Sequence, residues 1–274
     1  MRKDIQCTSQ EDKSSWHEII NKVNYLWRLI VTAIGFSLFA GGGFTLCLTI
    51  FPVIILFSRD CYQRANRVRY VICYIFKIYL AILEFLGVFK VNTHGLESLS
   101  TMRGHLVICN HPSLLDVVII MSRLNGIQCV VKNGLWSNPM IGGVVRAAGY
   151  IRNDISPELF LEECKKQLAK GENIIIFPEG TRSTPGQPLK LLRGLGNLAL
   201  AAQANIQALT LDCKPTTLTK GAKWYNIPPK KAIFNLRVGP LFPSTGYLSD
   251  APRSIRVRAL MRDIQQYYDR ELKI

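Results

Sequence analysis

The segment "NHPSLLD" (residues 110–116) holds the two side chains in this sequence that are best suited to moving a proton. It follows an apolar run, "HLVIC" (105–109), that has the composition of a buried strand. A carboxylate five residues after a histidine can hold one imidazole nitrogen, so that the other nitrogen accepts a proton. Pro112 favours a helix start, and we therefore expect His111 at or beside the helix cap, with its ring folded back toward Asp116.

No serine nucleophile accompanies this pair. The sequence has no G-x-S-x-G elbow and no P-loop, and its eight cysteines include no C-x-x-C pair. We expect buried, reduced cysteines and no metal or cofactor. A His–Asp pair without its own nucleophile would act on a hydroxyl of the substrate. Taken alone, the same spacing also fits a hydrogen-bonded histidine at a helix cap.

A second motif, "IIIFPEGTRS" (174–183), reads as a strand that leads into a Pro-Glu-Gly turn. Gly180 permits close approach of the backbone to a ligand, and the guanidinium of Arg182 can make a two-pronged contact with a phosphate. The turn therefore predicts an anion-binding site.

The overall charge also points to anionic partners. Lysine and arginine number 34 against 19 acidic residues, a net charge of +15, and 48% of the residues are hydrophobic. A strongly basic chain suits nucleic acid, an anionic lipid surface or phosphorylated substrates. No nucleic-acid-binding motif with interleaved aromatic residues is present, so we expect an anionic membrane and no nucleic acid.

The N-terminal third has the composition of a membrane module. After a polar segment (1–28), no charge occurs between Arg28 and Arg59. A bilayer core needs only ~20 helical residues. The glycines at 41–43 and Pro52 are places where so long a run can bend. One tilted span and a re-entrant hairpin both fit this pattern.

Four arginines follow the apolar run, at positions 59, 64, 67 and 69. By the positive-inside rule we expect the protein in the cytoplasmic (inner) membrane, with the residues that follow the apolar run in the cytoplasm. The next apolar segment, Arg69–Phe89, carries Arg69, Cys73, Lys77 and Glu84 as a narrow polar stripe at helical spacing. We expect an amphipathic helix in the membrane interface, with a second span as the alternative. Residues 29–89 thus form the predicted membrane-associated helical module.

Residues 90–274 predict an α/β domain. Short runs rich in β-formers, such as "HLVIC", "IQCVVK", "NIIIF" and "AIFNLRV", alternate with helical patterns. Ser156 before Pro157 is a good helix start, and Gly171 is a good stop. This alternation predicts a mixed, largely parallel sheet flanked by helices, with ligands near the carboxyl ends of its strands. The final segment, 254–272, predicts an amphipathic helix with a basic face that packs on the domain.

Together, "NHPSLLD" and "FPEGTRS" resemble the two signature motifs of the glycerophospholipid acyltransferases, especially the bacterial-type lysophosphatidate (1-acylglycerol-3-phosphate) acyltransferases. The resemblance covers roughly residues 88–240. It implies that His111 and Asp116 are catalytic and that the second motif helps to bind the acceptor phosphate. It also implies an enzyme of phospholipid biosynthesis that makes phosphatidic acid from an acyl-CoA or acyl carrier protein thioester and a lysophospholipid acceptor.

The remaining substrate-binding residues implied by this resemblance come from three segments. They are Glu179, Gly180, Thr181 and Arg182 in the "PEGTR" turn, Arg152 in "GYIRND", and Lys190 and Arg193 in "LKLLRGLGNLAL". The family usually has an arginine six residues after the glycine of the second segment, where this chain has Ile155. In the last block the family's proline is replaced by Ala208.

Three alternatives stay open. The acceptor could be another molecule, such as an unphosphorylated lysolipid, an ornithine lipid or a specialised lipid. A hydrolase could use the same His–Asp pair on thioesters or lysolipids. From another class, the chain could be a catalytically silent, membrane-bound lipid-binding protein.

Overall fold

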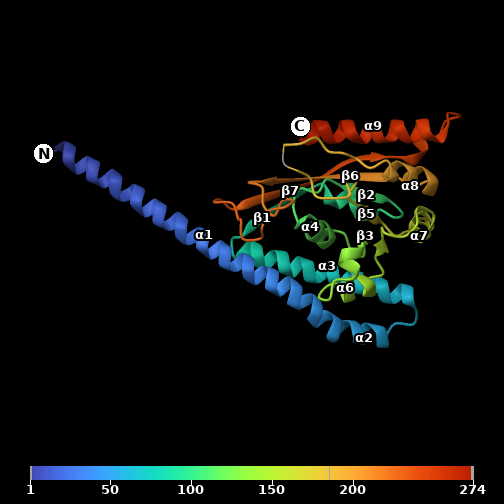
Figure 1. Cartoon of the computed structure of the whole chain (residues 1–274), viewed down its shortest axis with the longest axis horizontal. Coiled ribbons are helices and arrows are strands. Elements are labelled where there is room, and N and C mark those ends of the chain that lie inside the picture. Colours follow the sequence, from blue (N-terminus) through green and yellow to red (C-terminus); the bar gives the residue numbers. More distant parts are fainter. Residues whose placement is uncertain (1, 185, 273–274) are drawn as a thin grey trace.

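The structure is a computed structural model that describes residues 2–184 and 186–272, with the backbone alone for residues 2–15. A seven-stranded sheet lies between two layers of helices, and a long N-terminal helix extends well beyond the sheet (Figure 1). The strands are β1 (Phe89–His94), β2 (Leu106–Cys109), β3 (Gln128–Val131), β4 (Ile151–Arg152), β5 (Ile174–Ile176), β6 (Ile206–Lys214) and β7 (Ala232–Phe242).

The sheet is mixed and largely parallel, as the sequence predicts. Its strand order is β1-β7-β6-β2-β5-β3-β4, and β6 and β7 form its antiparallel pair. All four residues of β2 are buried, as expected for a central strand that is covered by helices on both faces. The sequence analysis missed β4, since its two residues are too few to show a strand pattern.

Helices cover both faces of the sheet. On one face lie α3 (Cys61–Phe85), α4 (Asp116–Arg123), α5 (Asn133–Trp136) and α6 (Gly142–Ala147), with α1 (Arg2–Leu48) and α2 (Ile50–Leu56) outside them. On the other face lie α7 (Pro157–Ala169), α8 (Gly194–Ala202) and α9 (Arg253–Leu272). Short 3-10 turns occupy Leu96–Leu99 and Ser244–Tyr247. Each face has its own hydrophobic core.

The predicted ends of α7 and the packing of α9 are confirmed. The Ser156 side chain accepts a hydrogen bond from the backbone N–H of Leu159. Gly171 follows α7 with φ +80°, a conformation in which glycine is favoured. Helix α9 buries an apolar stripe against the domain, including Leu260, Ile264 and Tyr268.

The N-terminal helix differs in part from the expectation. Helix α1 continues without a break through residue 28 and through the glycines at 41–43. The chain departs from it at Thr49, three residues before Pro52, because a proline ring clashes with the carbonyl four residues earlier. The boundary at residue 28 is therefore one of composition, and the three-part division of the chain stays a proposal.

Within the described residues, one helical segment is long and apolar enough to cross a membrane, Trp16–Leu56. By that measure α3 does not support the alternative of a second span. Instead, most of the polar stripe of α3 points inward, since Arg69 and Cys73 are buried and Glu84 accepts a hydrogen bond from the backbone of Val91, whereas Lys77 is exposed.

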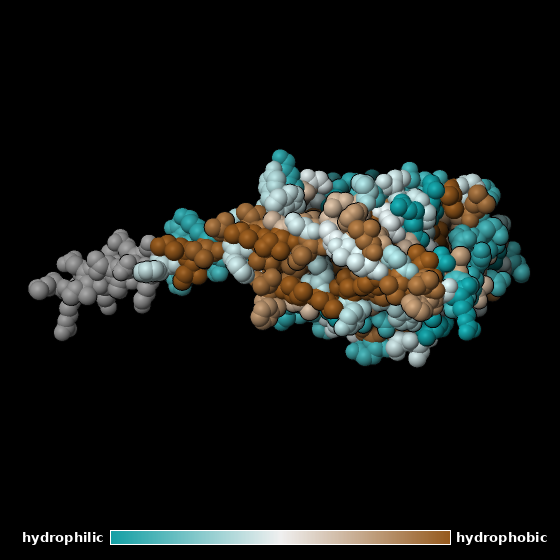
Figure 2. Space-filling view, turned by 90° about the horizontal axis from the view of Figure 1, so that it is seen from below, coloured by the Kyte–Doolittle hydropathy of each residue, from teal (hydrophilic) through white to brown (hydrophobic). Residues whose placement is uncertain are grey.

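The outer stripe of α3 is apolar. Its exposed side chains recur about every four residues: Tyr70, Tyr74, Ile78, Ile82 and Phe85. Helices α1 and α2 add further exposed aliphatic side chains, and Figure 2 shows hydrophobic residues gathered along this side of the molecule. An apolar surface of this kind marks a contact with a membrane or another apolar partner.

Candidate active site

The site begins where β2 leaves the sheet. The side chain of Asn110 donates to the backbone O of Leu211 (2.8 Å) and accepts from the backbone N–H of Leu211 (2.8 Å). The buried side-chain amide of Asn110 thus makes the two hydrogen bonds to β6 that the backbone of a paired strand would make. Because the side chain holds β6 in this way, the backbone is free to turn away from the sheet at His111.

His111 and Asp116 form the pair that the sequence predicts. The distance from His111 Nδ1 to Asp116 Oδ2 is 2.9 Å. Asp116 Oδ2 also accepts from the backbone N–H of Ser113 (2.6 Å). With Nδ1 bound to the carboxylate, Nε2 is the nitrogen left to exchange a proton with a ligand.

The position of the helix start corrects one expectation. Helix α4 begins at Asp116 with Leu115 as its N-cap, so Pro112 precedes the helix and His111 lies five residues before it. Residues 110–115 form a turn instead. In this turn the backbone N–H of Ser113 donates to the Asp116 carboxylate and so has a hydrogen-bond partner although it lies outside the helix.

Burial governs the electrostatics of the pair. Asp116 is fully buried, and burial raises its pKa to about 6, against the opposing effect of the hydrogen bond from His111. The His111 side chain is 15% exposed and stacks on Phe177, with ring centroids 4.2 Å apart. The imidazole is thus fixed on two sides and open on a third.

Glu179 of the second motif holds the first motif in place. Its Oε1 accepts from the backbone N–H of His111 (3.0 Å) and from Ser183 Oγ (2.8 Å). The Ser183 N–H in turn donates to the backbone O of His111 (2.8 Å). Burial raises the pKa of Glu179, and these hydrogen bonds oppose that shift. Glu179 therefore holds His111 and Ser183, and its predicted contact with substrate stays a prediction.

Gly180 has a steric reason to be glycine. Its φ is +66°, and a Cβ at this position would lie 2.8 Å from Leu192 Cδ1. The backbone N–H of Leu192 donates to the carbonyl of Pro178 (2.8 Å), which fixes the chain against this turn. A side chain here would press on the end of the Leu192 side chain and strain the turn that bears Thr181 and Arg182.

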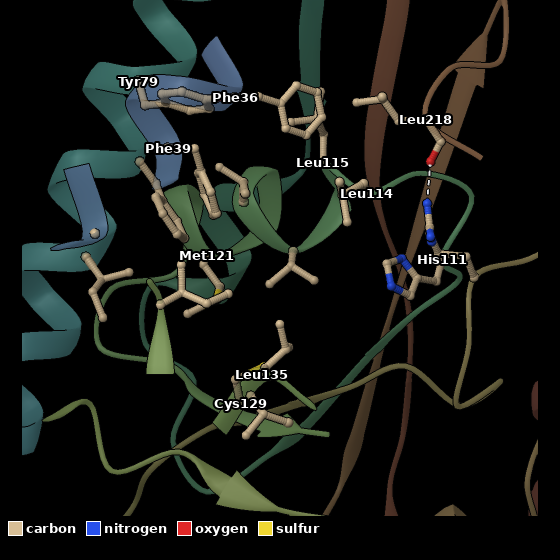
Figure 3. Close-up of a pocket in the computed structure, with 18 of the residues that line it drawn as sticks. Phe36, Phe39, Tyr79, His111, Leu114, Leu115, Met121, Cys129, Leu135 and Leu218 are labelled. Atoms are coloured by element: carbon tan, nitrogen blue, oxygen red, sulfur yellow. Dashed lines mark hydrogen bonds between the residues drawn. The ribbon is translucent and has the colours of Figure 1, made fainter. Parts of the chain in front are cut away.

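Arg182 reaches the loop between β6 and β7. Its Nη1 donates to the backbone O of Leu218 (2.9 Å) and of Thr219 (3.0 Å). Figure 3 shows one of these bonds, beside His111. Among the described residues both hydrogen bonds of Arg182 use Nη1, so its Nε and Nη2 donors remain for a ligand.

A cavity of about 750 Å³ opens at His111 and runs between the sheet and the N-terminal helices. Gly180, Thr181 and Arg182 line it together with His111. Away from these residues its walls are mainly apolar and come chiefly from α1, α3, α4, α5, α6 and β3, as Figure 3 shows in part. Representative wall residues are Phe36, Phe39, Tyr79, Leu115, Met121 and Leu135. The volume is in the range of pockets that enclose small ligands.

Four predicted substrate-binding residues do not line this cavity: Glu179, described above, and three basic residues. Arg152 pairs with both carboxylate oxygens of Asp154 (2.9 and 2.7 Å) and lies over the ring of Trp136. Lys190 and Arg193 are exposed, and Arg193 borders a separate groove between α8 and α9. Their predicted contacts with substrate stay predictions.

The structure adds polar residues that sequence reasoning did not assign to the site. Arg28 and Lys132 line the cavity, and Ser183 joins the two motifs. Arg28 carried a usable signal, as it is the last charge before a long apolar run. Ser183 could have been suspected from its place directly after Arg182. Lys132 lies in a segment whose sequence shows no pattern that would assign it to the site, apart from the resemblance to the family.

Chemically, this arrangement provides an oriented base at the polar end of an apolar cavity, with a guanidinium beside it. Among the described residues no group of three or more His, Cys, Asp or Glu side chains is placed to hold a metal ion.

Comparison with known proteins identifies the domain. Residues 90–212 match the family model described as Acyltransferase. The chain carries a domain of the acyltransferase family. The matched range contains both motifs of the site, from the strand before His111 to the loop after Arg182.

Several relatives of this acyltransferase domain have a 1-acyl-sn-glycerol-3-phosphate acyltransferase name. One from Helicobacter pylori is 29% identical over 154 residues, 54% of this chain and 62% of that protein. One from Pseudomonas aeruginosa is 28% identical over 171 residues, 61% of this chain and 63% of that protein. A chloroplastic one from Arabidopsis thaliana is 30% identical over 128 residues, 45% of this chain and 36% of that protein. The match thus spans 36–47% of the length of the first plant relatives.

A solved structure shares the fold. The 1-acyl-sn-glycerophosphate acyltransferase of Thermotoga maritima superposes with a TM-score of 0.60 at 20% identity, and the match covers 91% of this chain and 96% of that one. The N-terminal helices and the α/β layers therefore have a counterpart in that protein.

Proposed function

We propose that this protein is a membrane-bound O-acyltransferase that moves a fatty acyl group from a thioester to the free hydroxyl of 1-acylglycerol-3-phosphate, which yields phosphatidic acid. The observation that carries the proposal is the placement of His111 and Arg182 at one end of a single apolar cavity. A lysophosphatidate has a hydroxyl for the base, a phosphate for the guanidinium and an acyl chain for the cavity. The names of the relatives support the same acceptor.

In this mechanism His111 is the general base. Its Nε2 takes the proton of the acceptor hydroxyl as that oxygen attacks the thioester carbonyl and forms the new ester bond. The C–S bond then breaks, and the departing sulfur receives the proton from His111. Asp116 holds Nδ1 and stabilises the imidazolium between these steps. General-base catalysis of this kind contributes roughly 10²–10⁴-fold.

Substrate binding supplies the rest of the rate enhancement. Arg182 binds the acceptor phosphate through its free donors, which sets the distance between the hydroxyl and His111. Thr181 and Gly180 form the wall next to it. The donor is an acyl-CoA or acyl carrier protein thioester. Exposed Lys190 and Arg193 lie on the chain that follows the site, where they meet the polar part of the donor.

For localisation, we propose that α1 anchors the protein in the cytoplasmic membrane with the α/β domain in the cytoplasm. The long apolar segment Trp16–Leu56 and the exposed apolar stripe of α3 support membrane attachment. The arginines that follow the apolar run support the orientation. The acyl chains then enter the cavity from the bilayer side while the thioester arrives from water.

The proposal is tested with purified protein in bilayers, a labelled acyl-CoA and 1-acylglycerol-3-phosphate. Wild-type protein should form labelled phosphatidic acid, and His111→Ala should lose at least about a hundredfold of that rate because its base is missing. The variant must keep its fold and its membrane binding. Near-normal turnover by the pure variant would exclude His111 as the base.

A further inference from the structure

The loop between β6 and β7 (residues 215–231, here called the strap) has an unusual composition for a surface loop. Its sequence, "PTTLTKGAKWYNIPPKK", holds four lysines, one tryptophan and one tyrosine, and no acidic residue. All four lysines, at positions 220, 223, 230 and 231, are exposed. Trp224 and Tyr225 are also exposed, by 44% and 42%. Exposed aromatic rings among lysines are typical of the interface between a bilayer and water.

The inner side of the strap builds part of the site. Leu218 is buried, and its carbonyl accepts from the Arg182 guanidinium and from the backbone N–H of Leu114 (3.1 Å). The Thr219 carbonyl accepts a second bond from Arg182. Further along, Ile227 and Pro228 line the cavity. The position of the strap therefore sets the position of Arg182.

The strap also rests on helix α1. The Trp224 ring lies 6.2 Å from the ring of Phe36, and the carbonyl of Pro229 accepts a hydrogen bond from Arg28. The same stretch of α1 exposes Ile30, Ile34 and Leu38. The strap is therefore fixed to the stretch of α1 that carries these exposed aliphatic side chains.

We propose that the strap docks on the headgroup layer of an anionic bilayer, with Trp224 and Tyr225 at the acyl boundary and the lysines against the phosphates. Because the strap carries the two carbonyls that hold Arg182, docking fixes Arg182 for the acceptor. An anionic lipid surface matches the four lysines in charge, and its apolar interior matches the exposed rings of Trp224 and Tyr225 and the exposed aliphatic side chains of α1. The docking is inferred from the structure alone, whereas its effect on acceptor binding through Arg182 rests on the proposed function.

Docking is tested directly with brominated phospholipids, which quench tryptophan fluorescence on contact. The full-length protein and its Trp224→Phe variant are each mixed with vesicles of phosphatidylcholine and phosphatidylglycerol, brominated near the headgroup end of the chains. Subtraction gives the signal of Trp224 among the four tryptophans of the chain. This signal should be quenched. Absence of quenching at Trp224, while the other tryptophans are quenched, would overturn the proposal.

The link to Arg182 is tested by kinetics. In one variant the four strap lysines are replaced by glutamine. The matched control replaces four exposed basic residues of the opposite layer, Lys166, Arg258, Arg262 and Arg270, by glutamine. A lysine near an anionic surface strengthens binding roughly fivefold. On anionic vesicles the strap variant should raise the acceptor KM at least about fivefold with little change in the donor KM, and the control should behave as wild type.

On pure phosphatidylcholine vesicles the strap variant and wild type should have the same acceptor KM. Equal effects of the strap and control variants on anionic vesicles would mean that net charge alone acts, and would overturn the coupling. Quenching of Trp224 by an enzyme that is silent on every acceptor would refute the proposed function and leave the docking intact. Capture of the strap by an acidic soluble protein, without quenching by lipid, would refute the docking.

Discussion

At the scale of single residues, the central feature is a carboxylate that must work while it is fully buried. Asp116 receives two hydrogen bonds on Oδ2, and Oδ1 has no partner among the described residues. Burial accordingly raises its pKa to about 6, so the carboxylate is charged near neutral pH and becomes protonated at mildly acidic pH. A protonated Asp116 no longer stabilises the imidazolium of His111.

We therefore expect kcat/KM to fall about tenfold per pH unit below about pH 6, where Asp116 gains its proton. Asp116→Asn should lower the rate roughly 10²–10⁴-fold and remove the part of this decline that belongs to Asp116. A pH series of initial rates for both proteins measures this. An unchanged rate for Asp116→Asn would reduce Asp116 to a structural residue of α4.

Arg182 should act on the acceptor more than on the donor. Its loss should raise the acceptor KM by roughly tenfold to a hundredfold, since a hydrogen bond to a charged group contributes about 1.5–3 kcal/mol. Arg182→Lys should recover only part of this, because lysine keeps the charge and loses the paired donors. Kinetics of Arg182→Ala with phosphorylated and unphosphorylated acceptors provide the check. Equal losses on both would mean that Arg182 only holds the strap.

The residues of the site were predictable to different degrees. The pairing of His111 with Asp116 follows from local spacing, which the sequence shows directly. The contact of Glu179 with His111 does not, because it joins positions 68 residues apart and depends on β2 and β5 being neighbours in the sheet. The pairing of Arg152 with Asp154, two residues later, was readable from local spacing, but the resemblance to the family assigned Arg152 to the substrate instead.

At the scale of elements, α3 is held to the domain by a buried ion pair. Arg69 Nη2 lies 2.9 Å from Glu172 Oε1, and the guanidinium also donates to the carbonyls of Gly126 and Ala148. Tyr62 donates to the same carboxylate oxygen (2.6 Å). These contacts fix the helix that forms one wall of the cavity.

Removing one partner of this pair should be strongly destabilising. Arg69→Met leaves the Glu172 carboxylate buried without its cation, and we expect a loss of about 3–5 kcal/mol in the free energy of unfolding. Denaturation in detergent measures the loss. Arg69→Met combined with Glu172→Gln should be clearly more stable than Arg69→Met alone. If both variants unfold like wild type, the pair does not hold α3.

Most elements could be read from the sequence because their patterns are local. The capped helix α7 and the all-apolar strand β2 are examples. The inward direction of the polar stripe of α3 was not readable, because helical spacing shows that a stripe exists and does not show which neighbour it meets. The helix break at Thr49 follows from Pro52, whereas the glycines at 41–43 leave α1 unbroken.

At the scale of the whole molecule, the apolar side formed by α1, α2 and α3 lies opposite α7 and α9 (Figures 1 and 2). One side thus faces lipid in our proposal and the other faces water, with the cavity opening between them. The strand order and the depth of this cavity were beyond prediction from the sequence, because both depend on how distant segments pack.

This placement predicts the behaviour of the full chain in cells. The protein should stay in the membrane pellet after a carbonate wash, and a reporter fused after Ile274 should be active in the cytoplasm. A variant with charged substitutions at Ile30 and Ile34 should weaken retention. Release of the wild-type protein by carbonate, or a reporter on the outer side, would contradict the placement.

The choice of acceptor is the central claim, and one measurement tests it most directly. Purified protein in bilayers is given one acyl donor and an equal mixture of acceptors: 1-acylglycerol-3-phosphate, an unphosphorylated lysolipid and an ornithine lipid precursor. Mass spectrometry then identifies the products. We expect phosphatidic acid to dominate, and we expect its share to fall when Arg182 is replaced by alanine. A dominant product from an unphosphorylated acceptor, or free fatty acid without any acceptor product, would contradict the account.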